Sequence, residues 1–432
     1  MMYLKSVILL FLLVCTVNFQ EADSKKSAKT EDSPAASADS AASAEAPAGA
    51  AGANSTKAGA AGTFNIEDFG VVGDGKTDNA PGFLKAWKAA CAATGNPTIV
   101  ISKGDYLLGP VIFEGPCKGD HITIQLDGNL LGSTNLGSYK ENWLQFQHIN
   151  GLTITGTGTV DGQGAKTWPE NKCKSGGACK VFPMSMVFAF IEGLTVHGIT
   201  SVNSKYFHMN VFSSKNVELS SLTITAPEDS PNTDGIHLGD NTNVTITDVT
   251  IGTGDDCISV GPGTSKVSIT KVKCGPGHGI SIGSLGRYAN EKDVTDITVK
   301  SCTLTRTTNG LRIKTYQSNP TPLEVSGIHY EDITMDHVTY PIIIDQQYCP
   351  NGKCGGTGES TVKIVDVTYK GIKGTSADPN TVVLKCSAKN PCEQIDVSGI
   401  QITAPAGTSN ITCVNTKLGT ADASIKSACS DA

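Results

Sequence analysis

The chain has 432 residues, of which 34 are Lys or Arg and 41 are Asp or Glu, so its net charge is −7 and only 17% of its residues are charged. This composition excludes a disordered chain and a basic nucleic-acid-binding protein, and we expect no nucleic-acid partner. Hydrophobic residues make up 39% of the chain, which is enough for a large core. Length alone favours about three domains, but an elongated repeat fold grows by adding turns to one core.

The N-terminus carries a basic residue, Lys5, followed by an apolar run over residues 7–17. This run is too short for a membrane helix, which needs about 20 apolar residues, and no later run approaches that length. The pattern predicts a secretory signal peptide over residues 1–22 and a secreted protein without a membrane partner. Residues 23–62 are rich in Ala, Gly and Ser and predict a disordered linker, which leaves residues 63–432 as the folded domain.

Export predicts disulfide bonds. Of the 14 cysteines, Cys15 lies in the signal peptide, and the 13 that remain cannot all pair with one another. No CxxC pair or His-rich cluster argues for zinc in place of disulfides. Sequence proximity predicts six pairs, with Cys302 left over: Cys173–Cys179, Cys349–Cys354, Cys386–Cys392, Cys91–Cys117, Cys257–Cys274 and Cys413–Cys429. Glycosylation sequons occur at Asn54, Asn243 and Asn410, which fits a secreted glycoprotein.

A turn-rich segment, residues 73–78, precedes a helix-like stretch over residues 83–91, which predicts an N-terminal helical cap. Beyond the cap, short strands of alternating β-branched residues recur at spacings of 23 to 34 residues. These first strands are centred on residues 194–196, 217–219, 244–246, 267–269, 297–299, 328–330, 362–364 and 395–397.

A second series of strands aligns better, with spacings of 22, 22, 31 and 31 residues. Its members are residues 235–239, 257–261, 279–283, 310–314 and 341–345. Irregular periods built from short strands, with almost no helical periodicity, predict an all-β fold, the right-handed parallel β-helix, a solenoid like that of the pectin lyases. No leucine-rich repeat frame persists; an antiparallel β-sandwich is the alternative fold.

Stacking in register would place equivalent positions of successive coils in ladders about 4.8 Å apart. The residue before each second strand is then Asp234, Asp256, His278, Asn309 or Tyr340 in turn. Asp255 precedes Asp256, and Arg312 and Lys314 are two residues apart on one strand, so they share a face.

Each of these side chains also has a structural explanation. Asp and Asn cap turns, a His between two glycines can be a satisfied turn residue, and two cations can form a solvated edge. Together, however, three acids within about 5 to 10 Å repel one another and destabilise the fold, which favours a catalytic use.

Four short motifs carry a resemblance to a known family. They are Asn232-Thr-Asp-Gly235, Gly254-Asp-Asp256, Gly277-His-Gly279 and Arg312-Ile-Lys314. In this order and spacing the chain resembles the polygalacturonases, inverting glycoside hydrolases that degrade pectin, from about residue 64 to the C-terminus. Residues 203–209, 261–266 and 275–288 are most similar to the plant pollen exopolygalacturonases, some of which are allergens.

The resemblance implies a role for each motif residue. Asp255 is implied as the general acid, Asp234 and Asp256 as the groups that activate water, and His278 as support for the acid or as a substrate contact. Acid and base carboxyls about 6.5 to 9.5 Å apart suit inversion, and one coil plus a side-chain offset supplies that gap. We expect the neighbouring carboxylates to raise the pKa of Asp255 and keep it protonated.

Substrate binding is implied for Arg312 and Lys314, which would pair with the galacturonate carboxylate, and for Tyr348 and Asn232. The partner is polygalacturonate or pectin of the plant cell wall, and no cofactor or metal is implied, unlike in the Ca²⁺-dependent pectate lyases. A monomer is expected because the solenoid ends are capped.

Three functions remain open. The favoured function is that of an exo-acting galacturonan hydrolase, which releases galacturonic acid from non-reducing ends. An endo-polygalacturonase, or a hydrolase of a decorated pectin such as xylogalacturonan, is the alternative within the family, and a non-catalytic wall-binding β-helix is the alternative outside it.

Overall fold

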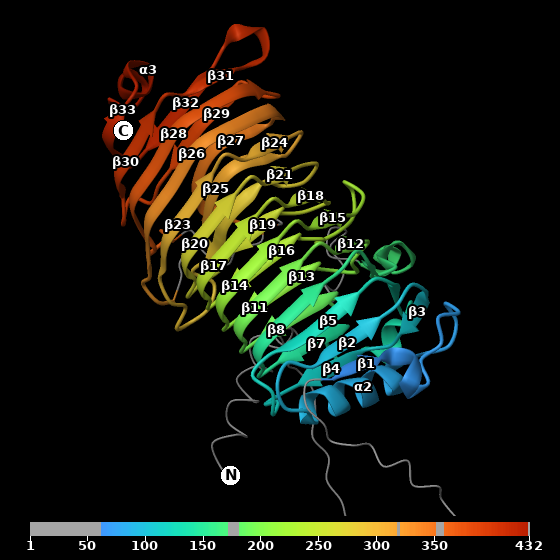
Figure 1. Cartoon of the computed structure of the whole chain (residues 1–432). Helices are drawn as coiled ribbons and strands as arrows, with labels where there is room; N and C mark the ends of the chain where they lie inside the picture. The colour runs from blue at the N-terminus through green and yellow to red at the C-terminus, as the bar shows by residue number, and fades with distance from the viewer. Residues whose placement is uncertain (1–61, 172–180, 318–319, 351–357, 431–432) are drawn as a thin grey trace, which may run out of the picture. The chain divides into compact units, whose positions relative to one another are not determined.

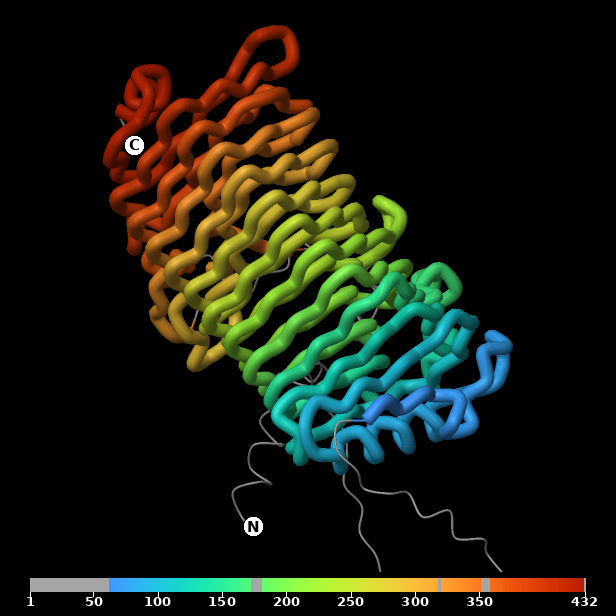
Figure 2. The backbone as a smooth tube through the Cα atoms, viewed as in Figure 1, coloured from blue at the N-terminus to red at the C-terminus, as the bar shows by residue number. Residues whose placement is uncertain are grey.

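The computed structural model describes residues 62–171, 181–317, 320–350 and 358–430. These residues form a parallel β-helix, in which successive coils stack along one axis (Figures 1 and 2). The predicted solenoid is confirmed. The signal peptide, nearly all of the linker and Asn54 lie outside the described residues. None of the described helices has the length and apolar character needed to cross a membrane.

One face of the coil is an 11-stranded parallel sheet that contains the second series of strands. Its members are β4 (Val111–Glu114), β7 (Leu144–Gln147), β10 (Met186–Ala189), β13 (Met209–Phe212), β16 (Ile236–Gly239), β19 (Ile258–Val260), β22 (Ile280–Leu285), β25 (Asn309–Tyr316), β27 (Tyr340–Tyr348), β29 (Asn380–Lys385) and β32 (Asn410–Val414).

The remaining strands form two parallel ladders, which merge in the long strands β26 and β28. The first ladder contains β1 (Thr63–Asn65), β2 (Thr98–Ile101), β5 (Ile122–Leu126), β8 (Asn150–Thr155), β11 (Glu192–His197), β14 (Lys215–Ser220), β17 (Thr242–Thr247), β20 (Ser265–Thr270), β23 (Val294–Lys300), β26 (Glu324–Val338), β28 (Lys363–Ser376), β30 (Cys392–Ser398) and β33 (Thr416–Ala421). The second contains β3 (Asp105–Leu108), β6 (Asn129–Gly132), β9 (Thr159–Asp161), β12 (Thr200–Val202), β15 (Thr223–Thr225), β18 (Thr250–Gly252), β21 (Lys273–Cys274), β24 (Thr303–Thr305), parts of β26 and β28, and β31 (Gln401–Thr403).

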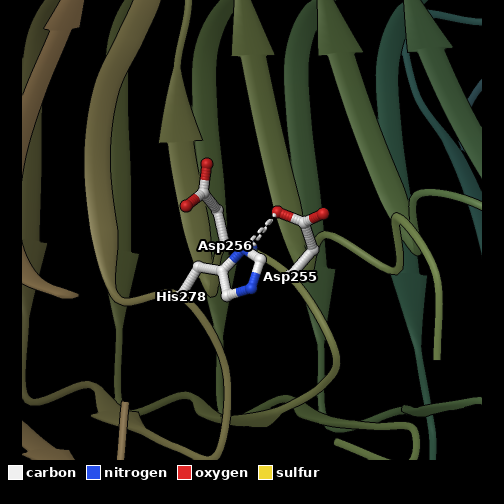
Figure 3. A group of neighbouring side chains, drawn as sticks. All are labelled: Asp255, Asp256 and His278. Atoms are coloured by element: carbon white, nitrogen blue, oxygen red, sulfur yellow. Dashed lines mark hydrogen bonds and ion pairs between the residues drawn. The ribbon is translucent and has the colours of Figure 1, made fainter. Parts of the chain in front are cut away.

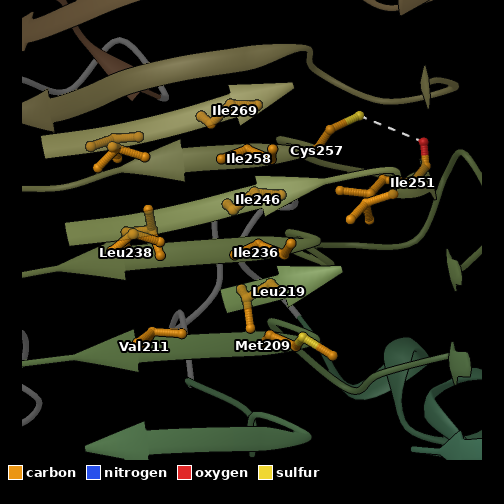
Figure 4. Close-up of a cluster of buried hydrophobic side chains, with 14 of the residues drawn as sticks. Met209, Val211, Leu219, Ile236, Leu238, Ile246, Ile251, Cys257, Ile258 and Ile269 are labelled. Atoms are coloured by element: carbon orange, nitrogen blue, oxygen red, sulfur yellow. Dashed lines mark hydrogen bonds between the residues drawn. The ribbon is translucent and has the colours of Figure 1, made fainter. Parts of the chain in front are cut away.

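The core lies inside the coil, where alternate residues of facing strands meet. Each strand is too short to bury an apolar face alone, so the coils share one continuous core. Figure 4 shows this layering, with Ile236 and Ile258 of one sheet beside Ile246 and Ile269 of the other. All four side chains are fully buried. β-Branched residues suit these positions because they pack well on a pleated surface.

The N-terminal cap is the helix α2 (Ala80–Ala92), which begins with Pro81 in its first turn. Its buried residues include Phe83, Trp87 and Ala90, spaced so that they share one face. The Trp87 ring lies 5.3 Å from that of Phe113, and its Nε1 donates to the Glu114 carbonyl at 3.1 Å. The helix thus covers the open end of the first coils. The C-terminal helix α3 (Ala423–Ala428) and five 3-10 turns complete the helical content of the described residues: η1 (Ile66–Phe69), η2 (Leu136–Ser138), η3 (Gly164–Lys166), η4 (Trp168–Glu170) and η6 (Pro405–Gly407).

The predicted register of the second strands is confirmed, because Ile236, Ile258, Ile280, Leu311 and Ile342 pair in succession. One assignment in the first series was wrong.

Ile328 pairs with Val367, and the predicted partner Val362 precedes β28. The reason is that β28 is 14 residues long and carries the same apolar alternation at several offsets, so the pattern alone does not define its register.

Four predicted disulfides are confirmed: Cys91–Cys117, Cys257–Cys274, Cys386–Cys392 and Cys413–Cys429. Cys302 is a buried free thiol, as predicted. The pairs predicted for Cys173 with Cys179 and for Cys349 with Cys354 involve positions outside the described residues, although Cys349 itself is disulfide-bonded.

Candidate active site

The predicted site residues gather where β16, β19, β22 and β25 begin. Asp234, Asp256 and His278 occupy the predicted positions just before their strands, and the His278 N–H donates to the Asp255 carbonyl at 2.8 Å. A Cβ at Gly254 would lie 2.0 Å from the Ser230 carbonyl oxygen, so only glycine fits before the acid pair. Close packing of adjacent turns therefore orients the two carboxylates.

Asp255 and His278 form an ion pair across adjacent coils. The His278 Nδ1 lies 3.0 Å from Asp255 Oδ1, and Figure 3 shows the imidazole turned toward that carboxylate. The other oxygen, Oδ2, accepts from Asn232 Nδ2 at 3.4 Å. The Asp255 side chain is 18% exposed, whereas the whole residues Asp234 and Asp256 are 6% and 1% exposed. Asp255 is therefore the carboxylate most accessible to a ligand.

Asp256 is held by two partners beneath the surface. Its Oδ2 accepts from Lys314 Nζ at 2.6 Å, and its Oδ1 accepts from Ser281 Oγ at 2.9 Å. The side chains of Asp256 and Lys314 are 2% and 9% exposed. Burial opposes the charged ammonium, but the Asp256 carboxylate outweighs it and raises the pKa of Lys314. Lys314 is therefore a fixed counterion for the Asp256 carboxylate.

The pKa values of Asp234 and Asp255 are shifted in opposite directions. Burial, reinforced by the charges of Asp255 and Asp256, holds the pKa of Asp234 well above its ordinary value, although Ser259 Oγ donates to Oδ2 at 3.2 Å. The predicted rise in the pKa of Asp255 is wrong.

Burial raises this pKa, but the hydrogen bond and charge of His278, together with Lys314, outweigh burial and lower it. The pKa of His278 is raised mainly by its hydrogen bond to Asp255. The sequence predicted that acids would be neighbours, but it did not reveal an imidazole 3.0 Å from one of them.

The predicted substrate-binding residues lie together on the next two coils. Arg312 lies over the Tyr348 ring at 5.1 Å from its centroid, and Lys314 lies at 5.5 Å from the same centroid. The Tyr348 ring thus contacts both cations, an arrangement that cation–π attraction stabilises. Asn232 contacts Asp255 directly. Contacts therefore link seven of the eight predicted site residues, and the charges of Asp255 and Asp256 act on the eighth, Asp234.

Sequence reasoning missed several members of the site. Ser259 and Ser281 occupy the ladder position that becomes Arg312 in the next coil, so the same alignment could have identified them. Tyr316 also escaped; its ring lies 5.3 Å from Tyr348. Tyr206 lies in the segment 203–209 that carries the resemblance but outside the four motifs, and its proximity to the acids arises only from the fold.

Asp255, Asp256 and His278 offer ligand atoms within 4.8 Å of one another, a set that could hold a metal ion. Two contacts oppose this use. The Lys314 ammonium already neutralises Asp256, and His278 Nδ1 is engaged with Asp255. A divalent cation would have to enter beside a buried lysine, which Coulomb repulsion disfavours. These residues fit acid–base chemistry better than metal binding.

The fold and site together define a parallel β-helix with a cluster of carboxylates on one sheet, the arrangement of a carbohydrate-processing enzyme. Residues 91–429 match the family described as Glycosyl hydrolases family 28. The chain belongs to this family and is a glycoside hydrolase.

Curated relatives agree with this assignment, and a solved structure agrees with the fold. The chain is 52% identical over 370 residues to an exopolygalacturonase of Zea mays, a match that covers 84% of this chain and 90% of the relative. It is 45% identical to an exopolygalacturonase of Platanus acerifolia, covering 82% and 94%. An endo-xylogalacturonan hydrolase of Aspergillus tubingensis shares the fold, with a TM-score of 0.68, 24% identity, and coverage of 83% and 100%.

Proposed function

We propose that this chain is a secreted exopolygalacturonase that hydrolyses α-1,4-galacturonosidic bonds of polygalacturonate with inversion and releases galacturonic acid from non-reducing ends. The observation that carries the proposal is the 52% identity to the maize exopolygalacturonase across 84% of the chain. The cluster of three carboxylates, one imidazole and two cations supplies the chemistry that this reaction needs.

In the proposed reaction Asp255 protonates the glycosidic oxygen while Asp234 and Asp256 orient and deprotonate a water on the opposite side of the sugar. The greater exposure of Asp255 supports its assignment to the leaving oxygen. Its lowered pKa means that the proton of the Asp255–His278 pair resides on the imidazole before substrate binds. Exclusion of water by the sugar then favours transfer of this proton to Asp255, since desolvation disfavours the ion pair.

Asp234 is the second candidate for the acid, because its pKa is the one that is raised. An aryl galacturonide with a good leaving group separates the two candidates, since it needs little protonation of the leaving oxygen. The acid variant, either Asp255→Asn or Asp234→Asn, should retain much more activity on the aryl substrate than on polygalacturonate. Loss of activity on both substrates marks a residue that acts on water.

Arg312 is the proposed partner of the carboxylate of one galacturonate, because its planar guanidinium matches a carboxylate. Tyr348 orients Arg312 through its ring, and Lys314 acts on the reaction through Asp256. The proposed substrate is cell-wall pectin. The four disulfides formed among the described residues support secretion. The capped ends of the solenoid support a monomer.

The experiment incubates the protein with polygalacturonate at mildly acidic pH and follows viscosity, reducing ends and products together. Monomeric galacturonic acid with little fall in viscosity is expected, and proton NMR should detect the β anomer first. A rapid fall in viscosity with mixed oligomers would instead establish endo cleavage. Absence of products from polygalacturonate and xylogalacturonan, with Asp255→Asn as the negative control, would refute a hydrolase of either substrate.

A further inference from the structure

A galacturonosidic bond has a carboxylate on the sugar at each side of it, so a cleft that recognises both sugars needs two accessible cations. Lys314 is already paired with Asp256 at 2.6 Å, and its side chain is 9% exposed. Arg312 therefore accounts for one carboxylate, and the other needs a different partner. Arg287 has the position and surroundings for this role.

Arg287 lies two residues after the end of β22, the strand that begins after His278. The loop that carries it is fixed, because the backbone N–H groups of Gly286, Arg287 and Tyr288 donate to the Glu291 carboxylate at 2.5, 3.0 and 2.8 Å. The Arg287 side chain is exposed, so it can reach a ligand from a rigid base.

A row of aromatic rings connects Arg287 to the proposed substrate cations. The Arg287 guanidinium lies 5.2 Å from the Tyr288 centroid and 5.6 Å from that of Tyr316. The Tyr316 and Tyr348 rings meet edge to face at 5.3 Å, and Arg312 lies over Tyr348. Two guanidinium groups are thus held by adjoining rings, which restrict their rotamers.

Tyr206 lies within range of the charges of Arg287 and of two acids. Burial is the main cause of its raised pKa; the charges of Asp234 and Asp255 raise this pKa further, and that of Arg287 lowers it. Arg287 and the two acids therefore lie near the same buried side chain.

We propose that Arg287 binds the carboxylate of a second galacturonate, next to the one bound by Arg312, so that the enzyme recognises two consecutive free acids. The inference rests on the proposed function. A methyl ester is neutral and forms no ion pair with a guanidinium, so esterification of the second sugar removes this contact. Arg287 would then determine the preference for unesterified pectin.

The test compares kcat and KM of the unsubstituted protein with those of Arg287→Gln and Arg287→Lys. The substrates are unesterified oligogalacturonates and the same oligomers carrying methyl esters. Arg287→Gln should raise KM for the unesterified oligomers about tenfold, equivalent to about 1.4 kcal/mol, with kcat within about twofold. It should raise KM for esterified oligomers much less, and Arg287→Lys should restore part of the binding.

Lys292→Gln is the matched control, because Lys292 is an exposed cation on the same loop whose ammonium pairs with Asp240 at 2.7 Å. It should leave both constants unchanged, and equal melting temperatures for the variants exclude misfolding. An unchanged KM in Arg287→Gln, or an equal rise on both substrates, overturns the inference and leaves the proposed function intact. Failure of the unsubstituted protein to release galacturonic acid refutes the proposed function itself.

Discussion

At the scale of single residues, the site depends on a buried ion pair between Asp256 and Lys314. Such a pair is costly to desolvate, and removing one partner leaves an uncompensated charge. It persists here because Ser281 and the Tyr348 ring provide further contacts to the two charges. The pair places a positive charge 2.6 Å from the Asp256 carboxylate, next to two other carboxyl groups.

Replacement of this lysine tests its structural contribution. Lys314→Met should lower the free energy of unfolding by about 3 to 5 kcal/mol, because the Asp256 carboxylate remains buried without a counterion. Urea unfolding measures the change. The double variant with Asp256→Asn should recover part of the loss, and Lys292→Met, at a side chain 69% exposed, should change stability by less than about 0.5 kcal/mol. Equal losses in the single and double variants would contradict an ion-pair role.

The Asp255–His278 pair predicts a pH dependence. The raised pKa of His278 makes its stabilising contribution complete below 6.5, its ordinary value, and lost as pH rises through the folded value. The lowered pKa of Asp255 makes its contribution complete above 3.8 and lost as pH falls through the folded value. The ion pair is therefore fully effective between these two ordinary values.

The activity should depend on the proton that Asp255 and His278 share. We expect kcat/KM to fall as pH rises through the raised pKa of His278, since the pair then loses the proton that Asp255 would deliver. His278→Asn keeps a polar side chain but cannot ionise, so its profile should lack this alkaline limb and its kcat should be reduced about 10²-fold or more. An unchanged limb in this variant would assign it to another group.

At the scale of elements, the strands are uniform and the connections between them differ. Most of the turns that precede the 11-stranded sheet near the site are short, with five residues between β18 and β19. The connection between β9 and β10 is much longer, and its described part contains Trp168. The Trp168 Nε1 donates to the Ser204 carbonyl at 3.1 Å, which fixes the ring over the next coil.

A pocket of about 350 Å³ lies between this connection and the turn before Asn232. Its lining residues are Ala165, Trp168, Pro169, Asn171, Asp229, Ser230 and Pro231. Pro231 of this lining precedes Asn232, which contacts Asp255, so the pocket lies near the proposed general acid. An exo enzyme needs its cleft bounded at one end, and we propose Trp168 as that boundary.

Trp168→Ala should therefore change the products. We expect this variant to release di- and oligogalacturonates together with the monomer, because the smaller side chain opens the end of the cleft, while Trp168→Phe should keep the monomer as the main product. Chromatography of early products measures the difference. Monomer as the sole product of Trp168→Ala would place the boundary elsewhere.

At the scale of the whole β-helix, stability is distributed along the axis because each coil contacts chiefly its neighbours. The ends are secured separately, by α2 with Cys91–Cys117 and by α3 with Cys413–Cys429. The catalytic coils contain their own buried disulfide, Cys257–Cys274, which begins one residue after Asp256.

This arrangement predicts that an end can loosen without loss of the site. The variant Cys413→Ser/Cys429→Ser should lower stability by about 2 to 5 kcal/mol, raise hydrogen exchange first in β32, β33 and α3, and retain most activity. The matched variant Cys257→Ala/Cys274→Ala should instead reduce activity, because it loosens the turn that carries Asp256. Equal loss of activity in both variants would indicate that the β-helix behaves as one cooperative unit.

The β-helix and the residue types of the site can be predicted from the sequence. Apolar alternation with short periods permits few folds, and the aligned segments from Ile236 to Ile342 place Asp234, Asp256 and His278 in adjacent coils. Backbone stacking is periodic, so one correct register positions every coil. The same reasoning failed at Val362, where a long strand offers several equivalent registers.

The distribution of charge within that site depends on the folded structure. Proton affinity depends on burial and on contacts of about 3 Å, which a ladder of residue types does not contain. The pKa of Asp255 is lowered because His278 lies 3.0 Å away, and that of Asp234 is raised by burial and by the charges of Asp255 and Asp256. Arg287 lies outside the four motifs, and its place beside the Tyr316 ring arises from the path of a connecting loop. Strand patterns are local properties of a chain, whereas electrostatics at a site depend on side chains that meet only after folding.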